Sequence, residues 1–451
     1  MRQTKFALAL LAAAALTACG GTDSSPGDQT HAVKFNQQVT FGDSLSDVGT
    51  YAVGAIAAAG GGRYTINGSN TSVNAAYTGL NWTEVLAAEL KLPAPCAAQT
   101  GLQGTDNANP ALDFNVPIVN HAACFNYAQG GSRVTDPIGP GNRAVTPSLG
   151  QMTLPVVSQV KNHLAKTGGK FSGTELVTIM AGGNDVLMQL GALSAGATAA
   201  GTAAGQKAFP TLLVSGLAPL VAPSNLPIAQ QTIGLAIQNA AVAGGDQTAI
   251  SGAAAMAAIN LGASPLAAQA AAEKAGTDAA AEGAKAGAAY AAQQGPVLVG
   301  ALGKAGAELA AIVKAELVAK GANYVVVNNL PDVAGTPSGK AQGADIQALI
   351  KAMVDAFNAQ LKSGLGDDPR IVYVDLFTIS RDQVTNPAPY GLTNTTARAC
   401  TSASSLTCTS KTLSAPDVSH YMFADDIHPT PFVYGLMTRY VLKEMAIKGW
   451  L

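Results

Sequence analysis

The chain has 451 residues, a formal net charge of −2 and only 12% charged side chains. This length provides one large domain or two modest domains, with ample apolar material for a core. The near-neutral balance excludes the strongly basic surface that nucleic-acid binding uses, so we expect no nucleic-acid partner. The low charge and the abundance of Ala and Gly favour an exported protein that meets apolar or neutral substrates.

Residues 1–18 have the pattern of an export signal, with two basic residues followed by an apolar run over 6–16. That run is too short to span a bilayer. It ends in Leu-Thr-Ala-Cys, which resembles a bacterial lipoprotein signal in which Cys19 is acylated. The alternative is an ordinary export signal whose cysteine is incidental.

The residues after Cys19 bear on localisation. No aspartate occupies the position that commonly retains lipoproteins in the inner membrane, so we expect an outer-membrane lipoprotein, on either face of that membrane. Residues 19–32 are rich in Gly, Ser, Asp, Pro and Thr and lack apolar periodicity. This composition predicts a flexible tether between the lipid and the folded domain.

A β-branched and aromatic run over 38–41 stops at Gly42 and leads into Asp43 and Ser44. A strand that ends in such a turn places the hydroxyl of Ser44 at the carboxyl edge of a parallel sheet, where open α/β sheets bind ligands. A serine there becomes a nucleophile only if a base takes its proton.

Two glycine-containing turns supply candidate hydrogen-bond donors. One contains Gly131, and the other precedes Asn184, just after a strand-like run over 176–179. Glycine lets a backbone N–H approach a substrate oxygen closely, and an Asn amide at a strand end donates beside it. Together with the N–H of Ser44 these groups would form a three-donor oxyanion hole.

Helical and strand patterns alternate along most of the chain, which predicts a parallel sheet with helices on both faces. Helices are expected at 82–92, 156–164, 305–320, 346–361 and 432–447, and strands at 38–42, 176–179, 324–327 and 371–376. This α/β pattern is interrupted once, so the predicted catalytic domain has two parts, 33–190 and 296–451.

The interruption spans residues 191–295, where Ala and Gly dominate. Because Ala favours helix and Gly opposes it, we expect several short, loosely packed helices and not one long rod. The insertion follows Asn184 closely, so it is expected near the rim of the site. It is either a lid that offers an apolar surface to an acyl chain or polyester, or a stability-neutral surface insertion. It has no uninterrupted apolar stretch of 18 or more residues, so we expect no membrane span.

A base for Ser44 lies close to the other end of the chain. Asp425 precedes His428 by three residues in a Pro-flanked loop. Asp425 can accept a hydrogen bond from one ring nitrogen of His428 and leave the other nitrogen to face Ser44. These are the nucleophile, base and orienter roles of serine hydrolases.

Five cysteines are present, and lipidation of Cys19 leaves an even set: Cys96, Cys124, Cys400 and Cys408. Export permits disulfides, although four cysteines allow three pairings. We favour Cys96 with Cys124 and Cys400 with Cys408, because both pairs close short loops. The cysteine spacing matches no zinc pattern, so we expect neither a metal site nor a cofactor.

Taken together, these motifs resemble the SGNH, or GDSL, hydrolases and in particular their bacterial lipase and esterase branch. The four blocks of that family occur in order, at residues 41–47, 126–131, 182–185 and 425–429. The resemblance implies a three-layer α/β/α fold of the flavodoxin-like type. No Gly-x-Ser-x-Gly elbow occurs, which argues against the α/β-hydrolase fold.

The resemblance also assigns roles to residues. It implies that Ser44 is the nucleophile, His428 the base and Asp425 the partner of the base. Asp425 has the family spacing, whereas the adjacent Asp426 is expected to cap or to face solvent. The oxyanion donors would be Ser44, Gly131 and Asn184.

We therefore expect a carboxylester hydrolase of lipid, phospholipid or polyester substrates. An alternative from the same family is a polysaccharide O-acetylesterase. A third reading is a non-catalytic surface or adhesion lipoprotein that has kept the fold. The expected partners are an ester substrate and a membrane reached through the N-terminal lipid.

Overall fold

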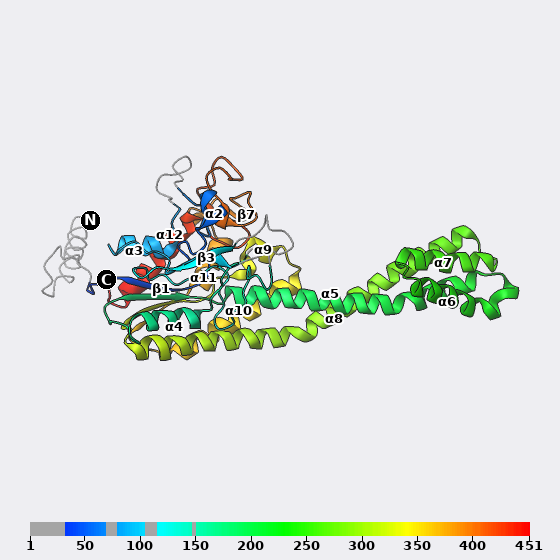
Figure 1. Ribbon diagram of the computed structural model, residues 1–451, viewed down its shortest axis with the longest axis horizontal. Coiled ribbons are helices and arrows are strands. Elements are labelled where there is room, and N and C mark those ends of the chain that lie inside the picture. The colour runs from blue at the N-terminus through cyan, green and yellow to red at the C-terminus, as the bar shows by residue number, and fades with distance from the viewer. Residues whose placement is uncertain (1–31, 69–78, 104–114, 147–149) are drawn as a thin grey trace, which may run out of the picture.

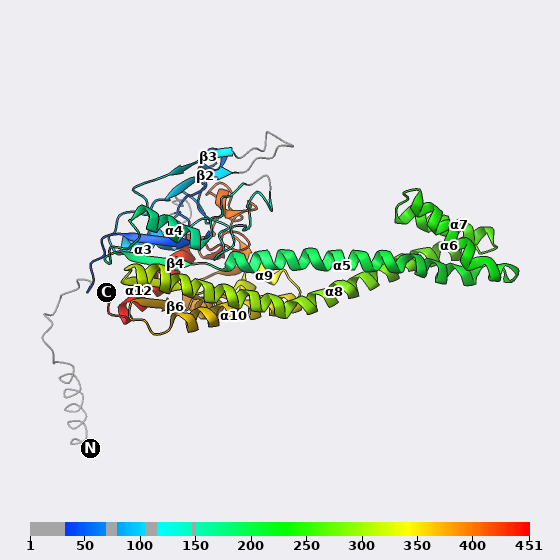
Figure 2. The same ribbon diagram turned by 60° about the horizontal axis from the view of Figure 1, so that its bottom comes forward.

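The computed structural model describes residues 32–68, 79–103, 115–146 and 150–451. The predicted signal peptide, the acylation site Cys19 and all but the last residue of the predicted tether lie outside the described residues. The protein has a rounded α/β part and a long helical arm that extends from it (Figures 1 and 2).

A four-stranded parallel sheet forms the centre of the α/β part. Its strands, in spatial order, are β1 (Gln38–Gly42), β4 (Leu176–Met180), β5 (Tyr324–Asn328) and β6 (Ile371–Val374). All three neighbouring pairs are parallel. The strands are β-branched and almost wholly buried, as expected for a parallel sheet covered on both faces.

Helices cover both faces of this sheet, so the predicted α/β class with a mostly parallel sheet is confirmed. Val39, Ile179 and Val327 pack on one face of the sheet. They share a core with α4 (Val156–Lys166), α10 (Ala344–Leu365) and the C-terminal part of α8 (Pro265–Ile312). Alternate strand residues, among them Leu176 and Val326, pack on the other face. The helices on that face are α3 (Trp82–Glu89) and α12 (Pro431–Ile447).

Smaller elements complete the α/β part. Strand β2 (Gln99–Gln103) pairs antiparallel with β3 (Asn115–Asn120), and β7 (Asn394–Arg398) pairs parallel with β8 (Tyr421–Phe423). The short helices are α2 (Gly54–Ala58), α9 (Pro337–Lys340) and α11 (Leu376–Thr385).

The arm departs from the sequence prediction. Its two long helices, α5 (Gly183–Leu217) and α8 (Pro265–Ile312), have 35 and 48 residues and run side by side (Figure 1). Helices α6 (Leu226–Val242) and α7 (Gln247–Asn260) close the far end. The prediction of several short, loosely packed helices is therefore wrong.

The predicted limits of the insertion also differ from the observed helices. Residue 191 lies inside α5 and residue 295 lies inside α8, so the arm and the α/β part share continuous helices. The helix expected over 305–320 is the end of α8, extended by a π-helical turn at Val313–Leu317 and a 3-10 turn at Val318–Lys320. It ends at Gly321, which has the left-handed conformation common at helix ends.

Close backbone contact between α5 and α8 explains why Gly-rich sequence forms long helices here. A Cβ atom on Gly283 would lie 2.7 Å from the carbonyl oxygen of Gly201, and one on Gly201 would lie 2.9 Å from that of Gly283. The helices approach because both residues lack that atom. Ala supplies helix propensity, and the packing offsets the roughly 1 kcal/mol that each Gly costs relative to Ala.

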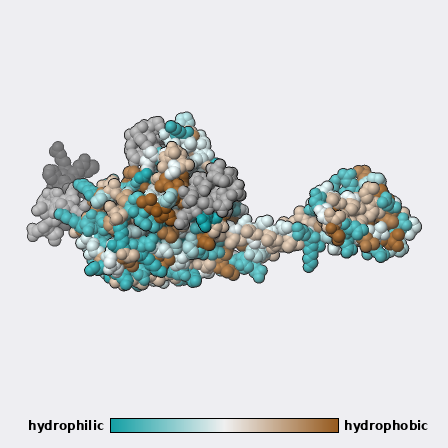
Figure 3. All heavy atoms as spheres, in the orientation of Figure 1, coloured by the Kyte–Doolittle hydropathy of each residue, from teal (hydrophilic) through white to brown (hydrophobic). Residues whose placement is uncertain are grey.

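The second long helix of the arm also has the length of a membrane span. Among the described residues, the helix over Pro265–Lys320 is long and apolar enough to cross a membrane, judged by length and composition only. The most apolar 18-residue window is 44% buried, and core helices pass the same test. Apolar residues also lie on the surface at the far end of the arm (Figure 3), among them Ile228, Leu235 and Val242.

We expect Gly283→Ala to destabilise the arm, because the new methyl group must push α5 and α8 apart. Overpacking of this kind costs about 1–3 kcal/mol, more than the helix propensity that Ala adds. The matched control is Gly234→Ala in α6, where an added Cβ meets nothing within 4 Å. Urea unfolding followed by circular dichroism should show a loss of stability for the first variant and a gain for the second. Equal stability of the two variants would contradict the close contact.

Candidate active site

The turn that carries Ser44 is fixed by a glycine and a glutamine. Gly42 ends β1 at φ +152°, and a Cβ atom there would lie 2.3 Å from the carbonyl oxygen of Met180 on the neighbouring strand. The side chain of Gln159 accepts from the N–H of Gly42 and donates to its carbonyl, both at 2.8 Å. Ser44 therefore begins the turn at the carboxyl edge of the sheet, buried but within a cavity.

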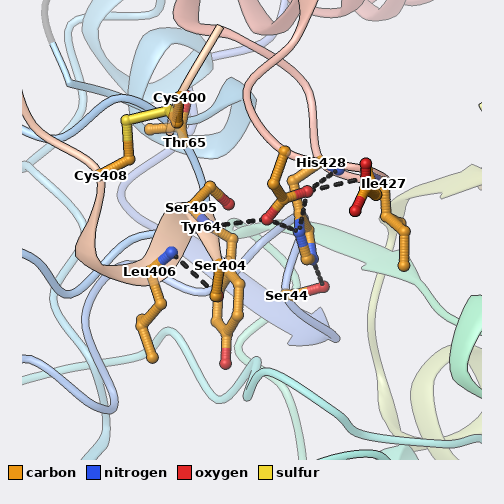
Figure 4. Close-up of polar contacts among 12 residues, drawn as sticks. Ser44, Tyr64, Thr65, Cys400, Ser404, Ser405, Leu406, Cys408, Ile427 and His428 are labelled. Carbon is orange, nitrogen blue, oxygen red and sulfur yellow. Dashed lines mark hydrogen bonds and ion pairs between the residues drawn. A yellow bond between two sulfur atoms is a disulfide. The ribbon is translucent and has the colours of Figure 1, made fainter. Parts of the chain in front are cut away.

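His428 lies against Ser44, although 384 positions separate the two residues in the chain. The Nε2 atom of His428 is 2.8 Å from the Oγ atom of Ser44 (Figure 4). Its Nδ1 atom is 2.9 and 2.8 Å from the two carboxylate oxygens of Asp425. A carboxylate only accepts, so Nδ1 carries the proton in the neutral ring and Nε2 is left to accept from the serine.

The capping of α12 sets the position of this histidine. Thr430 caps the helix through its hydroxyl, which accepts from the N–H of Val433, and Pro431 occupies the first turn. The loop before the cap is tied to another segment, because the hydroxyl of Thr65 donates to the carbonyl of Pro429 at 3.0 Å. The histidine thus approaches the serine from a fixed helix start.

Asp425 is almost fully buried and bound by several donors. Its Oδ1 atom accepts from the N–H groups of Ile427 and His428, at 2.9 and 2.8 Å, and its Oδ2 atom accepts from the N–H of Ser405 at 2.7 Å. Burial alone would raise the pKa of Asp425, but the charge and hydrogen bonds of His428, with the Ser405 N–H, hold it well below its usual range. The adjacent Asp426 is half-exposed and lies 3.5 Å from Arg398.

The two remaining candidates line the same cavity as Ser44 and His428. Gly131 has φ +82°, and a Cβ atom there would lie 2.2 Å from the carbonyl oxygen of Pro140. Asn184 lies in the first turn of α5, where its Nδ2 atom donates to the carbonyl of Ser132 at 2.9 Å. An amide group has two N–H donors, so one remains to face the cavity. The cavity has a volume of about 230 Å³.

Buried polar residues inside the motifs connect these pieces, and the sequence reasoning assigned them no role. Asp47 accepts from the N–H of Gly130 at 2.9 Å, which joins the serine turn to the Gly-Gly turn. Asn126 donates to the carbonyl of Ser46 at 2.9 Å. Asp185 pairs with Arg133 at 2.9 Å, which joins the Gly-Gly turn to the start of α5. Their location within the motifs was the available signal.

Tyr64 packs on the imidazole of His428. Its ring centroid is 4.8 Å from that of His428, and its hydroxyl accepts from the Nε2 atom of Gln151 at 2.6 Å. Both Tyr64 and Gln151 line the cavity. Gln151 has no local sequence signal, whereas Tyr64 lies in the Gly-, Asn-, Ser- and Thr-rich segment 51–81 that follows the serine turn. Only the folded arrangement places both residues at the cavity.

Two disulfides join the cysteines in the pairs favoured from the sequence, Cys96 with Cys124 and Cys400 with Cys408. Disulfides are typical of exported proteins and oxidising compartments. Within the described residues, no group of three or more His, Cys, Asp or Glu side chains is arranged to hold a metal ion.

A parallel α/β sheet that carries hydrogen-bonded Ser, His and Asp side chains at its carboxyl edge has the form of a serine hydrolase site. Comparison with known proteins agrees at this coarse level. No family model matches the chain. Two curated proteins of Arabidopsis thaliana, however, are similar to part of it.

The first relative, the anther-specific proline-rich protein APG, is 28% identical over 149 residues, and the second, a GDSL esterase/lipase, is 28% identical over 145 residues. These segments cover 31% and 29% of this chain. They cover 28% and 40% of the relatives, so the chain spans less than half the length of either one. This distant similarity supports a GDSL-like family and a hydrolase activity at most.

Asp43 should make stability depend on pH. Burial raises the pKa of Asp43 from 3.8, the value of an exposed carboxyl, to about 7. The N–H of Leu45 and the charge of His428 oppose this rise. The folded state therefore holds the proton more tightly than the unfolded state, and the contribution of this group to the free energy of unfolding falls as the pH rises from about 4 to about 7. We expect Asp43→Asn to flatten the pH dependence of urea unfolding in this window.

The matched control for this measurement is Asp426→Asn, which removes a half-exposed carboxylate next to Asp425 in the chain. This variant should change the slope less than Asp43→Asn does. A wild-type slope in Asp43→Asn would show that Asp43 does not titrate between the folded and unfolded states in this way.

Proposed function

We propose that this protein is a serine carboxylester hydrolase in which Ser44 is the nucleophile, His428 the base and Asp425 the residue that orients the base. The observation that carries this proposal is the 2.8 Å contact between the serine hydroxyl and the imidazole, with the buried carboxylate on the opposite ring nitrogen. Ser44 and His428 are 384 positions apart, so the local sequence alone does not bring their side chains into contact.

The proposed reaction is acyl transfer in two steps. His428 takes the proton of Ser44 while the serine oxygen attacks the ester carbonyl, and the imidazolium is stabilised by Asp425. The protonated imidazole then gives its proton to the leaving alcohol, which frees an acyl-enzyme. Water repeats the sequence: His428 removes its proton, the acid leaves, and the serine hydroxyl is restored.

The negative charge on the carbonyl oxygen needs donors that are fixed before the reaction begins. In the proposed hole these are the N–H groups of Ser44 and Gly131 and the side-chain amide of Asn184. Asn184 is held by its bond to the carbonyl of Ser132, so it does not have to reorganise as the charge develops. In comparable sites a single such donor contributes about 100- to 1000-fold to turnover.

The lining of the cavity favours a lipid-like acyl ester. Around the reacting groups it presents aliphatic side chains, namely Leu45, Leu187, Leu330, Val333 and Ile427, and one aromatic ring, that of Tyr64. A second, largely apolar cavity shares four lining residues with it: Leu45, Pro331, Thr336 and Ile427. An acyl chain has an apolar continuation here, whereas a polysaccharide cleft would be expected to present more aromatic rings.

The arm does not act on this cavity in the present conformation. No described residue between 191 and 295 lines it, and the far end of the arm lies well away from the sheet (Figure 2). The predicted lid role therefore lacks a contact in this structure. With α5 alone of 35 residues, or about 50 Å at 1.5 Å per residue, a large movement would be needed to bring the far end over Ser44.

For localisation, the disulfides support an exported protein, and we extend this to an outer-membrane lipoprotein anchored through Cys19. The support for the anchor is the sequence around Cys19 alone. A non-catalytic surface role is the weaker hypothesis, because the proposed catalytic side chains are all present and in contact.

Ser44→Ala and His428→Ala should each lower ester hydrolysis by at least about 1000-fold, because nucleophile and base act as one unit. Hydrolysis of a nitrophenyl ester measures the loss, and a fluorophosphonate probe should label the unmodified protein but not Ser44→Ala. Ser215→Ala, which changes an exposed serine on the arm, is the matched control and should keep full activity. Full activity in Ser44→Ala would refute the proposed function.

The two substrate hypotheses differ in their dependence on acyl length. For a lipid-like substrate we expect kcat/KM on nitrophenyl esters to rise from acetyl to longer acyl chains, because each buried methylene contributes about 0.8 kcal/mol. A phospholipid, a polyester and an acetylated glycan complete the comparison. Selectivity for acetyl groups, with turnover of the glycan, would favour the O-acetylesterase instead.

A further inference from the structure

One donor to the carboxylate of Asp425 comes from outside its own turn. The N–H groups of Ile427 and His428 reach Oδ1, as expected for a carboxylate that folds back on the following residues. The Oδ2 atom instead accepts from the main-chain N–H of Ser405, 20 positions earlier, at 2.7 Å (Figure 4). In the described part of the chain, the other donor to Oδ2 is the imidazole itself.

The Ser405 amide belongs to a short loop whose ends are joined by the Cys400–Cys408 disulfide, at a sequence separation of 8. The first end is fixed to the segment before Asp425, because the N–H of Cys400 donates to the carbonyl of Ala424 at 2.9 Å. Cys400 and Cys408 are both buried. The covalent bond therefore holds the loop against the same turn that contains Asp425.

The other end of the loop is held by Asn67, which is only 3% exposed. The N–H of Asn67 donates to the carbonyl of Cys408 at 2.8 Å. Its side-chain Nδ2 atom lies 3.1 Å from the same carbonyl oxygen and 3.0 Å from that of Ser405. The same segment contains Thr65, whose hydroxyl donates a hydrogen bond to the carbonyl of Pro429, the residue after His428.

The main chain of Ser405, and not its hydroxyl, makes the contact with Asp425. Its Oγ atom is buried and has no hydrogen-bond partner in the described part of the chain. Ser405 is the first residue of a 3-10 turn, Ser405–Thr407, and the preceding Ser404 has an extended backbone and caps that turn through its hydroxyl. The local geometry therefore directs the Ser405 N–H outward, toward the carboxylate.

From this arrangement we infer that the main-chain N–H of Ser405, held by the Cys400–Cys408 loop, positions Asp425 within the proposed Ser44–His428–Asp425 triad. It keeps Oδ2 aligned with the Nδ1 atom of His428 while the ring gains and loses its proton. Ser405 touches neither substrate nor the reacting atoms, so it acts only through Asp425. This inference rests on the proposed function, and it adds a disulfide loop to the groups on which turnover depends.

A matched pair of substitutions at one position tests the inference. Ser405→Pro replaces the N–H by the ring Cδ, which cannot stay 2.7 Å from Oδ2 and so breaks the contact with Asp425. The backbone itself permits proline, because the residue opens a helical turn and follows an extended residue. Ser405→Ala keeps the N–H and removes only the unpartnered hydroxyl. We expect Ser405→Pro to lower kcat roughly 10- to 100-fold, as for loss of a hydrogen bond to a charged group, and Ser405→Ala to stay within about twofold of the unmodified enzyme.

Separate measurement of kcat and KM distinguishes positioning from general damage. Misalignment of Asp425 affects the transition state, so KM for a nitrophenyl ester should remain unchanged in Ser405→Pro. A wild-type kcat in that variant would overturn the inference, as would an equal loss in Ser405→Ala. A crystal structure of Ser405→Pro with both oxygens of Asp425 still on Nδ1 of His428 would also overturn it, independently of any assay.

The disulfide has its own test in case the proline variant does not fold. The double variant Cys400→Ala/Cys408→Ala should lower kcat at least about fivefold, because the loop that carries the Ser405 N–H becomes looser. This loss is expected to be smaller than the loss caused by removing the hydrogen bond itself. Cys96→Ala with Cys124→Ala removes the other disulfide, which donates nothing to Asp425, and should leave kcat near that of the unmodified enzyme. Equal kcat in the two double variants would overturn the role of the loop. If the unmodified protein shows no Ser44-dependent hydrolysis, the proposed function fails instead.

Discussion

The contact between the hydroxyl of Ser44 and the imidazole of His428 is the constraint on which the rest of the α/β part depends. The serine follows the first strand and the histidine precedes the last helix. The two side chains therefore come together only when the whole sheet has formed. Residues 38–42 must pair with β4, and α12 must pack on the opposite side of the sheet from α4. A local error in either element would separate the two side chains.

Buried polar groups make this arrangement specific. Gln159, Asp47 and the Arg133–Asp185 pair each join segments that are distant in sequence, and each would be left with unsatisfied groups if its segment shifted. An unpaired polar group in a poorly solvated interior costs more than the net gain of the bond it replaces. The interior around Ser44 therefore tolerates few alternatives, and it holds the carboxylates of Asp43 and Asp47 where burial raises their pKa values to about 7 and about 6.

The arm follows from a different physical rule. Its first helix begins beside the site, with Asn184 in the opening turn, and then continues away from the sheet. In the contact between α5 and α8, small residues replace the large apolar side chains that pack the sheet. Main chains approach closely at Gly201 and Gly283, and a separate apolar core at the far end includes Leu213 and Ile233. The far end of this extension contributes no described residue to the cavity around Ser44.

Strand periodicity, ordered motifs and short loops are local properties, so they were enough to predict the parallel α/β class, the site candidates Ser44 and His428 and the favoured cysteine pairs. Features that depend on contacts between distant segments became visible only in the folded protein. The arm became long helices because packing between α5 and α8 overrode the unfavourable propensity of Gly. Tyr64 and the amide of Ser405 acquired their places beside His428 and Asp425 only through folding, since no local pattern distinguishes a residue whose importance lies in what it touches.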